Sequence, residues 1–278
     1  MQGKGSGHPV SLPMPRIWLD SLKANGIHIN YFGSKFYLYK FSLYCFFKGI
    51  IKVLLLLFQY KSHPLNNKKS AVFIDLTLAN VPHSKERKSY DLISWYKRSN
   101  IKDPAVKDIY AQVNGANFDF ILPNIIVCSR IFSSHKNWGD YLKYFLKVFK
   151  AITIAFFGML IGKWWYGLLF DESAYFQYIS IFNNNDLPQE YLFHQGSAGF
   201  KPLWTYEAEK KGSRISLYWY STNSGPYDVG NHKIESDIGL KIMQWNHMIV
   251  WNEEQKKHWI KYCPKTHYKI TGPIQFLD

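Results

Sequence analysis

The stretch that decides the fold is Tyr191–Asn223, with the sequence YLFHQGSAGFKPLWTYEAEKKGSRISLYWYSTN. A run of β-forming residues, Tyr191–His194, is followed by the glycine-containing turn Gly196–Gly199. Good helix formers occupy residues 202–211, and Ile215–Tyr220 is again β-rich. This order predicts a strand–helix–strand unit, in which ligands bind where the strands give way to loops. Such a unit can also serve packing alone, without a ligand.

The same alternation continues on both sides of this unit. The further predicted strands are Ala71–Leu76, Phe120–Leu122, Ile125–Cys128, His247–Trp251 and Tyr268–Pro273. Helices are predicted over residues 84–99, 103–112 and 253–262. Strands that alternate with helices indicate an α/β fold with a Rossmann-like, open, mostly parallel sheet and flanking helices. We expect this domain to occupy residues 70–278.

Residues 1–69 form a separate N-terminal region in this interpretation. The first 16 residues are polar and rich in proline and glycine, which indicates a flexible leader and not a secretory signal. Residues 27–41 have an alternating pattern that favours a strand. Residues 42–60 predict an amphipathic helix, buried or lying in a membrane interface, since their longest apolar run is far shorter than the ~20 residues of a membrane span.

Tyr141–Phe170 is a second apolar segment with a regular basic pattern. Lys143, Lys147 and Lys150 are spaced so that they share one helical face, and Trp164 and its neighbours follow the apolar centre as interfacial aromatic residues do. Three interpretations remain open: a core helix packed on the sheet, a helix attached to a membrane interface, and a true span.

The composition limits the classes of partner. A net charge of +14 favours polyanions such as nucleic acid, an anionic membrane, or phosphorylated sugars and lipids. The basic residues form no tight run and no RNP, KH or zinc-finger pattern occurs, so we do not expect nucleic-acid binding. Three distant cysteines, Cys45, Cys128 and Cys263, show no ligand spacing; we expect no metal and reduced thiols in a cytosolic protein.

Two residues of the central unit are candidate catalytic groups. His194 stands at the carboxyl end of a predicted strand, where α/β sheets usually bind ligands, and it could act as acid, base or ligand contact. Glu207 in the following helix could serve as a general base for a hydroxyl. The alternatives are an ordinary polar strand end for His194 and a solvated helix carboxylate for Glu207.

The remaining candidates are substrate contacts around the same strand ends. Glycines let the backbone approach a ligand, aromatic faces stack on sugar rings, and hydroxyl and amide groups bond to sugar hydroxyls. An ordinary turn or cap explains such residues equally well. The predicted substrate-binding residues are Gly196, Ser197, Lys201, Trp204, Tyr218, Tyr220, Ser221 and Asn223.

Three segments of the chain resemble bacterial surface-polysaccharide biosynthesis proteins of the PFTS motif group, which are assigned as glycosyltransferases of lipopolysaccharide O-antigen loci. They are FHQGSAGFKPLWTYEAEKKGSRISLYWYSTN, HMIVWNEEQKKHWI and YKITGPIQF. The resemblance covers residues 70–278 and is best from 190 onward. The strand that ends in Gly272–Pro273 is similar to the end of the first Rossmann-like half of a GT-B glycosyltransferase.

The resemblance implies transfer of a sugar from a nucleotide-activated donor, which is CMP-linked in one version, to a lipid-linked glycan. It implies no cofactor, and it implies a location at the cytoplasmic face of the inner membrane, peripheral on its anionic surface. The PFTS stretch itself is not found in these residues, so we expect this chain to be the acceptor-side half and its partner to be a missing donor domain or downstream polypeptide. The alternatives are a non-enzymatic membrane-associated scaffold subunit and an epimerase-like α/β protein.

Overall fold

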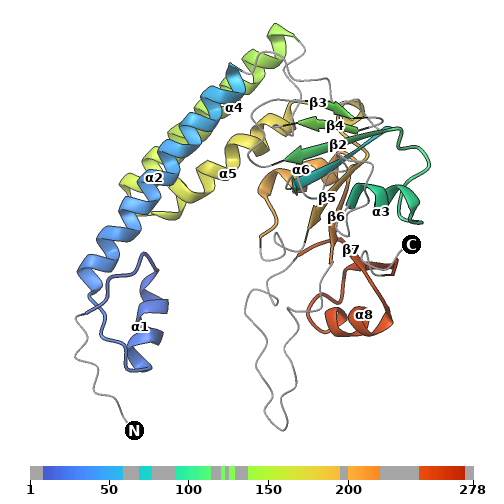
Figure 1. Cartoon of the computed structure of the whole chain (residues 1–278). Coiled ribbons are helices and arrows are strands. Elements are labelled where there is room, and N and C mark those ends of the chain that lie inside the picture. Colours follow the sequence, from blue (N-terminus) through green and yellow to red (C-terminus); the bar gives the residue numbers. More distant parts are fainter. Residues whose placement is uncertain are drawn as a thin grey trace. The chain divides into compact units, whose positions relative to one another are not determined.

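The chain divides into two compact units, which are described separately. A helical unit comprises Met1–Gln59 and His135–Ile181, and a sheet unit comprises Tyr60–Ser134 and Phe182–Asp278. The computed structural model (Figure 1) describes residues 9–58, 69–76, 92–113, 120–122, 125–128, 137–194, 200–219 and 244–272.

The sheet unit is built on one open sheet of eight strands. Their order across the sheet is β3-β4-β2-β1-β5-β6-β7-β8. The seven strands from β4 to β8 pair in parallel, and β3 joins the edge antiparallel to β4. The predicted α/β class and Rossmann-like sheet are therefore confirmed. The strands are β1 (Ser70–Leu76), β2 (Asp108–Val113), β3 (Phe120–Leu122), β4 (Ile125–Cys128), β5 (Glu190–His194), β6 (Arg214–Tyr218), β7 (His247–Val250) and β8 (His267–Ile270).

The order of the strands reverses in the middle of the sheet. From β1 the chain adds β2 and β4 on one side, and then returns to place β5 on the other side of β1. The later strands β6, β7 and β8 extend outward from β5. The boundary between β1 and β5 is therefore the topological switch point, and ligands of open α/β sheets bind at the carboxyl ends of the strands there.

Helices cover both faces of the sheet. On one face, Tyr96 of α3 (Leu92–Arg98) packs edge-on against Phe73, with ring centroids 5.3 Å apart. On the other face, Trp204 of α6 (Leu203–Lys210) contacts Tyr191 of β5, with centroids 5.0 Å apart. The residues of the central strands β1 and β5 are almost all buried, on both faces of the sheet. Strands buried on both faces explain the short, nearly continuous apolar runs of the sequence.

The last part of the sheet unit confirms the predicted strand–helix–strand pattern. Helix α8 (Glu253–Ile260) connects β7 to β8, and the side chain of Asn252 caps it by accepting a hydrogen bond from the Gln255 backbone N–H at 2.8 Å. Trp259 of α8 packs against Trp219 in a tilted arrangement, with ring centroids 4.1 Å apart. Glu253 and Glu254 lie in the first turn of α8, where the helix dipole favours negative charge.

The described residues of the helical unit form four helices, of which α2 and α4 are the longest. They are α1 (Arg16–Ala24), α2 (Tyr31–Leu57), α4 (Trp138–Leu160) and α5 (Trp165–Ser180). Helix α5 packs against both α2 and α4. Phe46 of α2 contacts Phe170 of α5 at 5.1 Å between ring centroids, and Tyr144 of α4 contacts Tyr178 of α5 at 5.2 Å.

Ion pairs and a close contact at a glycine hold α2 against α5. Asp171, which is 8% exposed, pairs with Lys48 at 3.1 Å and with Lys52 at 2.7 Å. Gly49 lets Phe170 approach, since a Cβ built there would lie 2.6 Å from its ring. The two lysines align the helices, because the nearly buried Asp171 carboxylate needs counter-charges inside the interface.

Two sequence predictions are wrong in the described residues. The strand expected over residues 27–41 is mostly helix, because α2 begins at Tyr31, where Asn30 caps it by accepting a hydrogen bond from the Gly33 N–H at 2.9 Å. The helix expected over 103–112 is instead the strand β2, paired on both edges. In both segments the pattern fitted either period, and tertiary packing decided.

The division into units also differs from the division expected from the sequence. Residues 135–181 join the N-terminal helices instead of the sheet that precedes and follows them in the chain. The segment 141–170 is two helices, α4 and α5, joined by a turn in which Gly162 has a φ of +86°. Across the described part of the chain, no helix combines the length and apolarity that crossing a bilayer requires.

Candidate functional site

The switch point of the sheet carries a contact between its two central strands. His194 is the last residue of β5, and its Nε2 lies 3.1 Å from the backbone carbonyl oxygen of Asp75 in β1. A carbonyl oxygen can only accept, so this hydrogen bond requires a proton on Nε2. In the neutral imidazole, Nδ1 is then the nitrogen that can accept a proton, as a general base must.

Asp75 has an unusual backbone conformation at this position. Its φ is +58°, in the left-handed region, and it is the one non-glycine residue with positive φ in the described part of the chain. The pairing of β1 with β2 shifts register between Phe73 and Leu76, which makes a bulge around Asp75. Gln112 of β2 holds the bulge, because its side-chain oxygen accepts a hydrogen bond from the Asp75 N–H at 3.0 Å. Bulges and left-handed residues of this kind gather near functional sites.

Tyr218 is brought next to His194. The two residues are register partners on β5 and β6, so their side chains leave the same face of the sheet. The Tyr218 side chain is fully buried and packs against Trp95 of α3, with ring centroids 5.9 Å apart. The structure thus places these two predicted site residues side by side, with the buried Tyr218 ring packed next to the end of β5.

The predicted residues of α6 lie in other surroundings. Glu207 pairs with Lys211 at 3.9 Å, and Lys211 also donates to the Phe182 carbonyl. Because the helix of a parallel crossover runs back along the strands, these groups at its carboxyl end lie toward the amino-terminal edge of the sheet. The structure therefore does not bring Glu207 to the end of β5 where His194 lies.

Lys201 and Trp204 are occupied by contacts within the sheet unit. The Lys201 ammonium bonds to both carboxylate oxygens of Glu209, at 2.9 and 2.8 Å, and lies 4.4 Å from the centroid of the Tyr206 ring. Its side chain is only 3% exposed. Trp204 is a core residue between α6 and β5. The predicted substrate contacts Gly196, Ser197, Tyr220, Ser221 and Asn223 lie outside the described residues.

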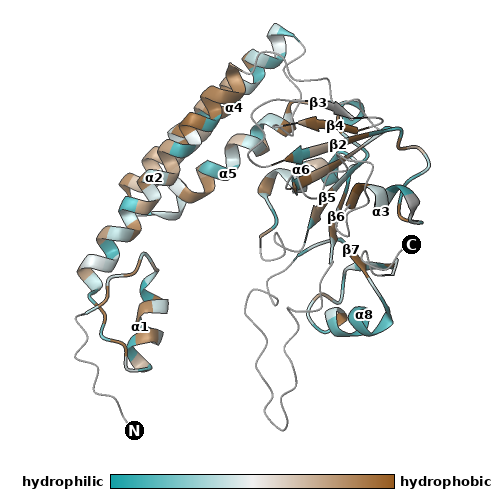
Figure 2. Cartoon of the chain, viewed as in Figure 1, coloured by the Kyte–Doolittle hydropathy of each residue, from teal (hydrophilic) through white to brown (hydrophobic). Residues whose placement is uncertain are grey.

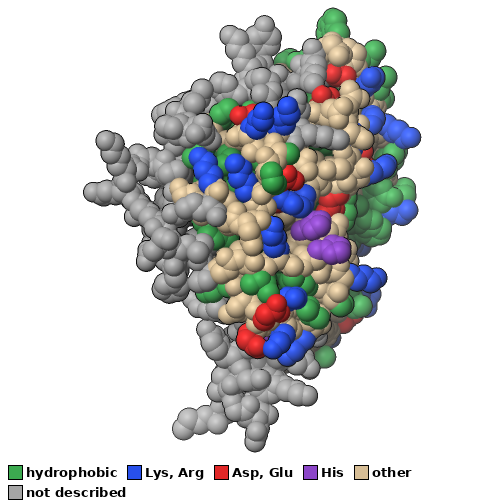
Figure 3. Space-filling model, turned by 90° about the vertical axis from the view of Figure 1, so that its right-hand side faces the viewer, with side chains coloured by type: hydrophobic (Ala, Val, Ile, Leu, Met, Phe, Trp, Pro, Cys, Tyr) green, Lys and Arg blue, Asp and Glu red, His purple; other side chains and the backbone are tan. Residues whose placement is uncertain are grey.

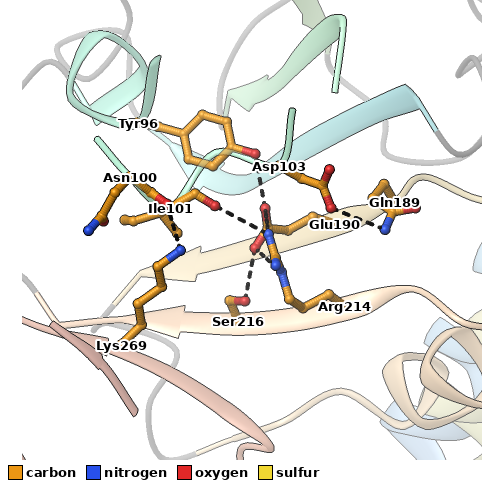
Figure 4. Close-up of polar contacts among 9 residues, drawn as sticks. All are labelled: Tyr96, Asn100, Ile101, Asp103, Gln189, Glu190, Arg214, Ser216 and Lys269. Carbon is orange, nitrogen blue, oxygen red and sulfur yellow. Dashed lines mark hydrogen bonds and ion pairs between the residues drawn. The ribbon is translucent and has the colours of Figure 1, made fainter. Parts of the chain in front are cut away.

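The opposite, amino-terminal edge of the sheet holds a buried ionic network (Figure 4). Glu190 of β5 is fully buried, and its carboxylate accepts two bonds of 2.8 Å from the Arg214 guanidinium of β6. Tyr96 and Ser216 donate to the same carboxylate at 2.9 and 3.0 Å. Burial and the adjacent carboxylate raise the pKa of the Tyr96 hydroxyl, which therefore stays a donor. Burial lowers the pKa of Arg214, but its hydrogen bond and charge interaction with Glu190 outweigh this and leave it raised.

Two histidines stand beside this network at the starts of β7 and β8. The rings of His247 and His267 stack with centroids 5.4 Å apart. Burial, then the neighbouring His267 and then Arg214 lower the pKa of His247. On the face seen in Figure 3, histidine side chains lie among lysine and arginine side chains. The network and the pair hold the strand starts together, and we regard this edge as structural.

The site at the carboxyl edge was only partly visible in the sequence. His194 was found from its place at a strand end, but Asp75 and Gln112 were not, because nothing in a buried strand pattern marks a bulge. An acid inside an apolar run was the one available signal. Among the described side chains, no group of three or more histidine, cysteine or acidic residues is arranged to hold a metal ion.

Comparison with protein families gives one match. Residues 145–278 match the family model described as "Polysaccharide biosynthesis PFTS motif protein". The match includes β5 to β8, and thus His194 and Tyr218, but not the bulged strand β1. It supports the predicted polysaccharide biosynthesis family and a role in polysaccharide biosynthesis. Comparisons with curated proteins and with solved structures yield no match.

Proposed function

We propose that the protein is a glycosyltransferase of surface polysaccharide biosynthesis, with His194 as the general base. The observation that carries this proposal is the contact of His194 with the strained Asp75 at the switch point of the sheet. The family match supplies the biosynthetic context. A Rossmann-like sheet with a histidine at that point is suited to hold a sugar hydroxyl and to remove its proton.

In the proposed reaction, a hydroxyl of a lipid-linked glycan attacks the anomeric carbon of a nucleotide-activated sugar. The new glycosidic C–O bond forms while the bond from the anomeric carbon to the donor phosphate breaks. The phosphate leaves with that electron pair, and Nδ1 of His194 takes the hydroxyl proton. The Asp75 carbonyl fixes the tautomer that leaves Nδ1 able to do this.

The donor half of the enzyme is the second part of this proposal. GT-B transferases bind donor and acceptor with two Rossmann-like domains, and the described residues contain one sheet. We propose that a second domain, in the same polypeptide or in a partner, holds the nucleotide sugar, of which a CMP-linked sugar is one candidate. No cofactor or metal takes part in the proposed chemistry.

The test is sugar transfer by wild type and by His194→Gln. The protein, with its donor-binding half present, is incubated with nucleotide sugars of the CMP, UDP, GDP and dTDP classes and with extracted lipid-linked glycan. Loss of a general base lowers kcat by about 10²–10⁴-fold. We expect that loss in His194→Gln, with the circular dichroism spectrum of wild type.

Two matched variants make the result specific. His267→Gln changes an exposed histidine at the opposite edge of the sheet, and transfer should stay within about twofold of wild type. Glu207→Gln tests the second predicted base, and we expect a small effect because this carboxylate pairs with Lys211. Full turnover in His194→Gln would refute the role of His194 as general base. Glycan binding by wild type with no transfer from any donor class would refute transferase activity in favour of a binding subunit.

A further inference from the structure

Among the described residues, the helical unit exposes more large hydrophobic side chains than the sheet unit. Of the 31 large hydrophobic side chains that are exposed in the described residues, 28 belong to the helical unit. Figure 2 shows hydrophobic residues along much of α2 and α4. A contiguous exposed apolar surface marks an interaction site, since single scattered apolar residues are the normal case.

Helix α4 shows how this surface is organised. Its buried residues, Tyr144, Val148, Ala155 and Gly158, lie on the side that faces the other helices. At 100° per residue, a second apolar stripe covers roughly 60° of a different side. All its members are exposed, by 47% to 85%, and we call them the α4 stripe: Trp138, Leu142, Phe145, Phe149, Phe156 and Leu160.

Lysines border the α4 stripe on one side. Lys143 and Lys150 are exposed and lie about 20° apart around the helix, beyond the edge of the stripe. Lys147, on the same side, donates to Ser180 at 2.7 Å. An apolar stripe with lysines at its margin is the pattern of a helix that lies in a membrane interface with its ammonium groups at the headgroups.

The charge of the whole unit agrees with an anionic partner. Residues 1–59 and 135–181 contain 12 lysine and arginine residues against four aspartate and glutamate residues. One of those acids, Asp171, is already paired with two lysines. The aromatic residues Trp164 and Trp165 stand at the turn between α4 and α5, and indole rings prefer the headgroup level of a bilayer.

An apolar cavity opens beside the start of α4. It has a volume of about 480 Å³, within the range of ligand sites, and is lined by Leu57 of α2 with Trp138, Gly139, Tyr141, Leu142 and Phe145. Three of these residues belong to the α4 stripe. A cavity with an almost entirely apolar lining, on a stripe bordered by lysines, fits an acyl chain whose phosphate stays outside.

We propose that the α4 stripe lies in the interface of an anionic bilayer, with Lys143 and Lys150 bound to lipid phosphates and an acyl chain in the cavity. The relevant surface would be the cytoplasmic face of the inner membrane. This proposal does not depend on sugar transfer, because it concerns the helical unit and is measured with lipid alone.

The experiment is flotation of the full chain with vesicles. Vesicles of phosphatidylcholine are compared with vesicles that contain one third phosphatidylglycerol, at about 0.1 M and about 0.5 M salt, where screening differs strongly. We expect binding to anionic vesicles at low salt, weakened by high salt. Each lysine near an anionic surface contributes about fivefold, so Lys143→Gln/Lys150→Gln should lower the partition coefficient by roughly 30-fold.

Two further variants separate the charge from the apolar stripe. Lys261→Gln/Lys265→Gln removes the same charge from exposed positions of the sheet unit and should change partitioning by less than about threefold. Leu142→Gln/Phe149→Gln alters side chains that are 59% and 61% exposed, so the fold should persist while the salt-resistant part of binding is lost.

Several outcomes would overturn the proposal. Absence of wild-type protein from floated anionic vesicles would do so, as would equal losses in the two double-lysine variants. Light scattering that shows a stable dimer, dissociated by Leu142→Gln/Phe149→Gln, would assign the stripe to a second copy of the chain. Retention of the protein in membranes after alkaline carbonate extraction would indicate a span in place of an interfacial helix.

Discussion

Replacement of Arg214 by methionine should be among the most destabilising single changes in the sheet unit. Methionine keeps most of the side-chain length but removes the guanidinium that bonds twice to Glu190. The Glu190 side chain is fully buried, whereas that of Arg214 is 31% exposed. The variant therefore leaves a carboxylate without its counter-charge at a place that water does not reach.

The size of the effect follows from this asymmetry. Removing one partner of a buried ion pair costs about 3–5 kcal/mol, because the remaining charge is uncompensated. The hydrogen bonds from Tyr96 and Ser216 remain and satisfy part of the carboxylate. Glu190→Gln is milder, at about 1.5–3 kcal/mol, since the guanidinium left behind can reach water. The double variant should cost less than the sum of the two by about 1–3 kcal/mol.

Hydrogen exchange followed by mass spectrometry measures this effect within the sheet unit. Peptides that cover β5 and β6 should exchange roughly 150- to 5,000-fold faster in Arg214→Met, if exchange follows the opening equilibrium. Arg16→Met is the matched control, because Arg16 is 87% exposed and its pair with Asp20 spans 3.8 Å. An exposed pair contributes 0–1 kcal/mol, so protection of these peptides should not change in the control.

Strict additivity would refute this reasoning. If the double variant loses as much unfolding free energy as the sum of the losses in Arg214→Met and Glu190→Gln, the two side chains do not interact in the folded protein. A cost for Arg214→Met below about 1 kcal/mol would mean that water reaches the carboxylate, and that the network is a surface pair.

Two further predictions concern pH and packing. Burial, His267 and Arg214 lower the pKa of His247, so below about pH 6.5 the unfolded chain binds the proton first and the sheet unit loses stability as the pH falls. The urea midpoint should be lower at pH 5.5 than at pH 7.0. His267→Gln should reduce this difference, and an unchanged difference would contradict the effect of His267 on the pKa of His247. Gly167→Ala should destabilise the helical unit by about 1–3 kcal/mol despite the better helix propensity of alanine, because a Cβ there overlaps the Ser42 carbonyl oxygen. A thermal midpoint equal to or above that of wild type would show that α2 and α5 can separate at no cost.

The sheet was predictable where its strands are buried on both faces. Segments such as Ala71–Leu76 and Ile215–Tyr218 are short, mostly apolar runs, a pattern that favours a strand buried on both faces. The helix prediction for residues 103–112 was wrong because the segment is mixed in polarity. The strand β2 forms there through its pairing with β1 and β4. Pairing partners are not visible in a single segment, so this error lies in tertiary context.

The helical unit was harder to predict, for a different physical reason. Apolar residues fill most positions of Tyr31–Leu57, so the strand period and the helix period both fit parts of it. The alternation over residues 27–41 favours a strand, whereas the structure begins a helix at Tyr31 behind the cap at Asn30. The joining of residues 135–181 to the N-terminal helices depends on contacts such as Lys52 with Asp171, more than 100 residues apart, which no local pattern encodes.

The candidate site shows the same limit at the level of single residues. His194 was recognisable because its position at a strand end follows from the local pattern. Its partner Asp75 depends on a bulge, which is a property of two paired strands. Trp204 is a predicted substrate contact because aromatic faces stack on sugar rings, yet it packs in the core against β5, and the predicted contact Lys201 is held by Glu209.

The two proposals address different problems of one reaction. A lipid-linked glycan stays in the plane of its bilayer, so an enzyme bound to the same bilayer meets it at a raised effective concentration. The variant Lys143→Gln/Lys150→Gln should therefore reduce transfer to a lipid-linked acceptor, while proton transfer to His194 stays unchanged. Conversely, loss of His194 removes proton transfer and leaves vesicle binding intact, since the histidine belongs to the sheet unit. Each experiment can thus fail by itself, and the pair distinguishes a membrane-bound catalyst from a membrane-bound binding subunit.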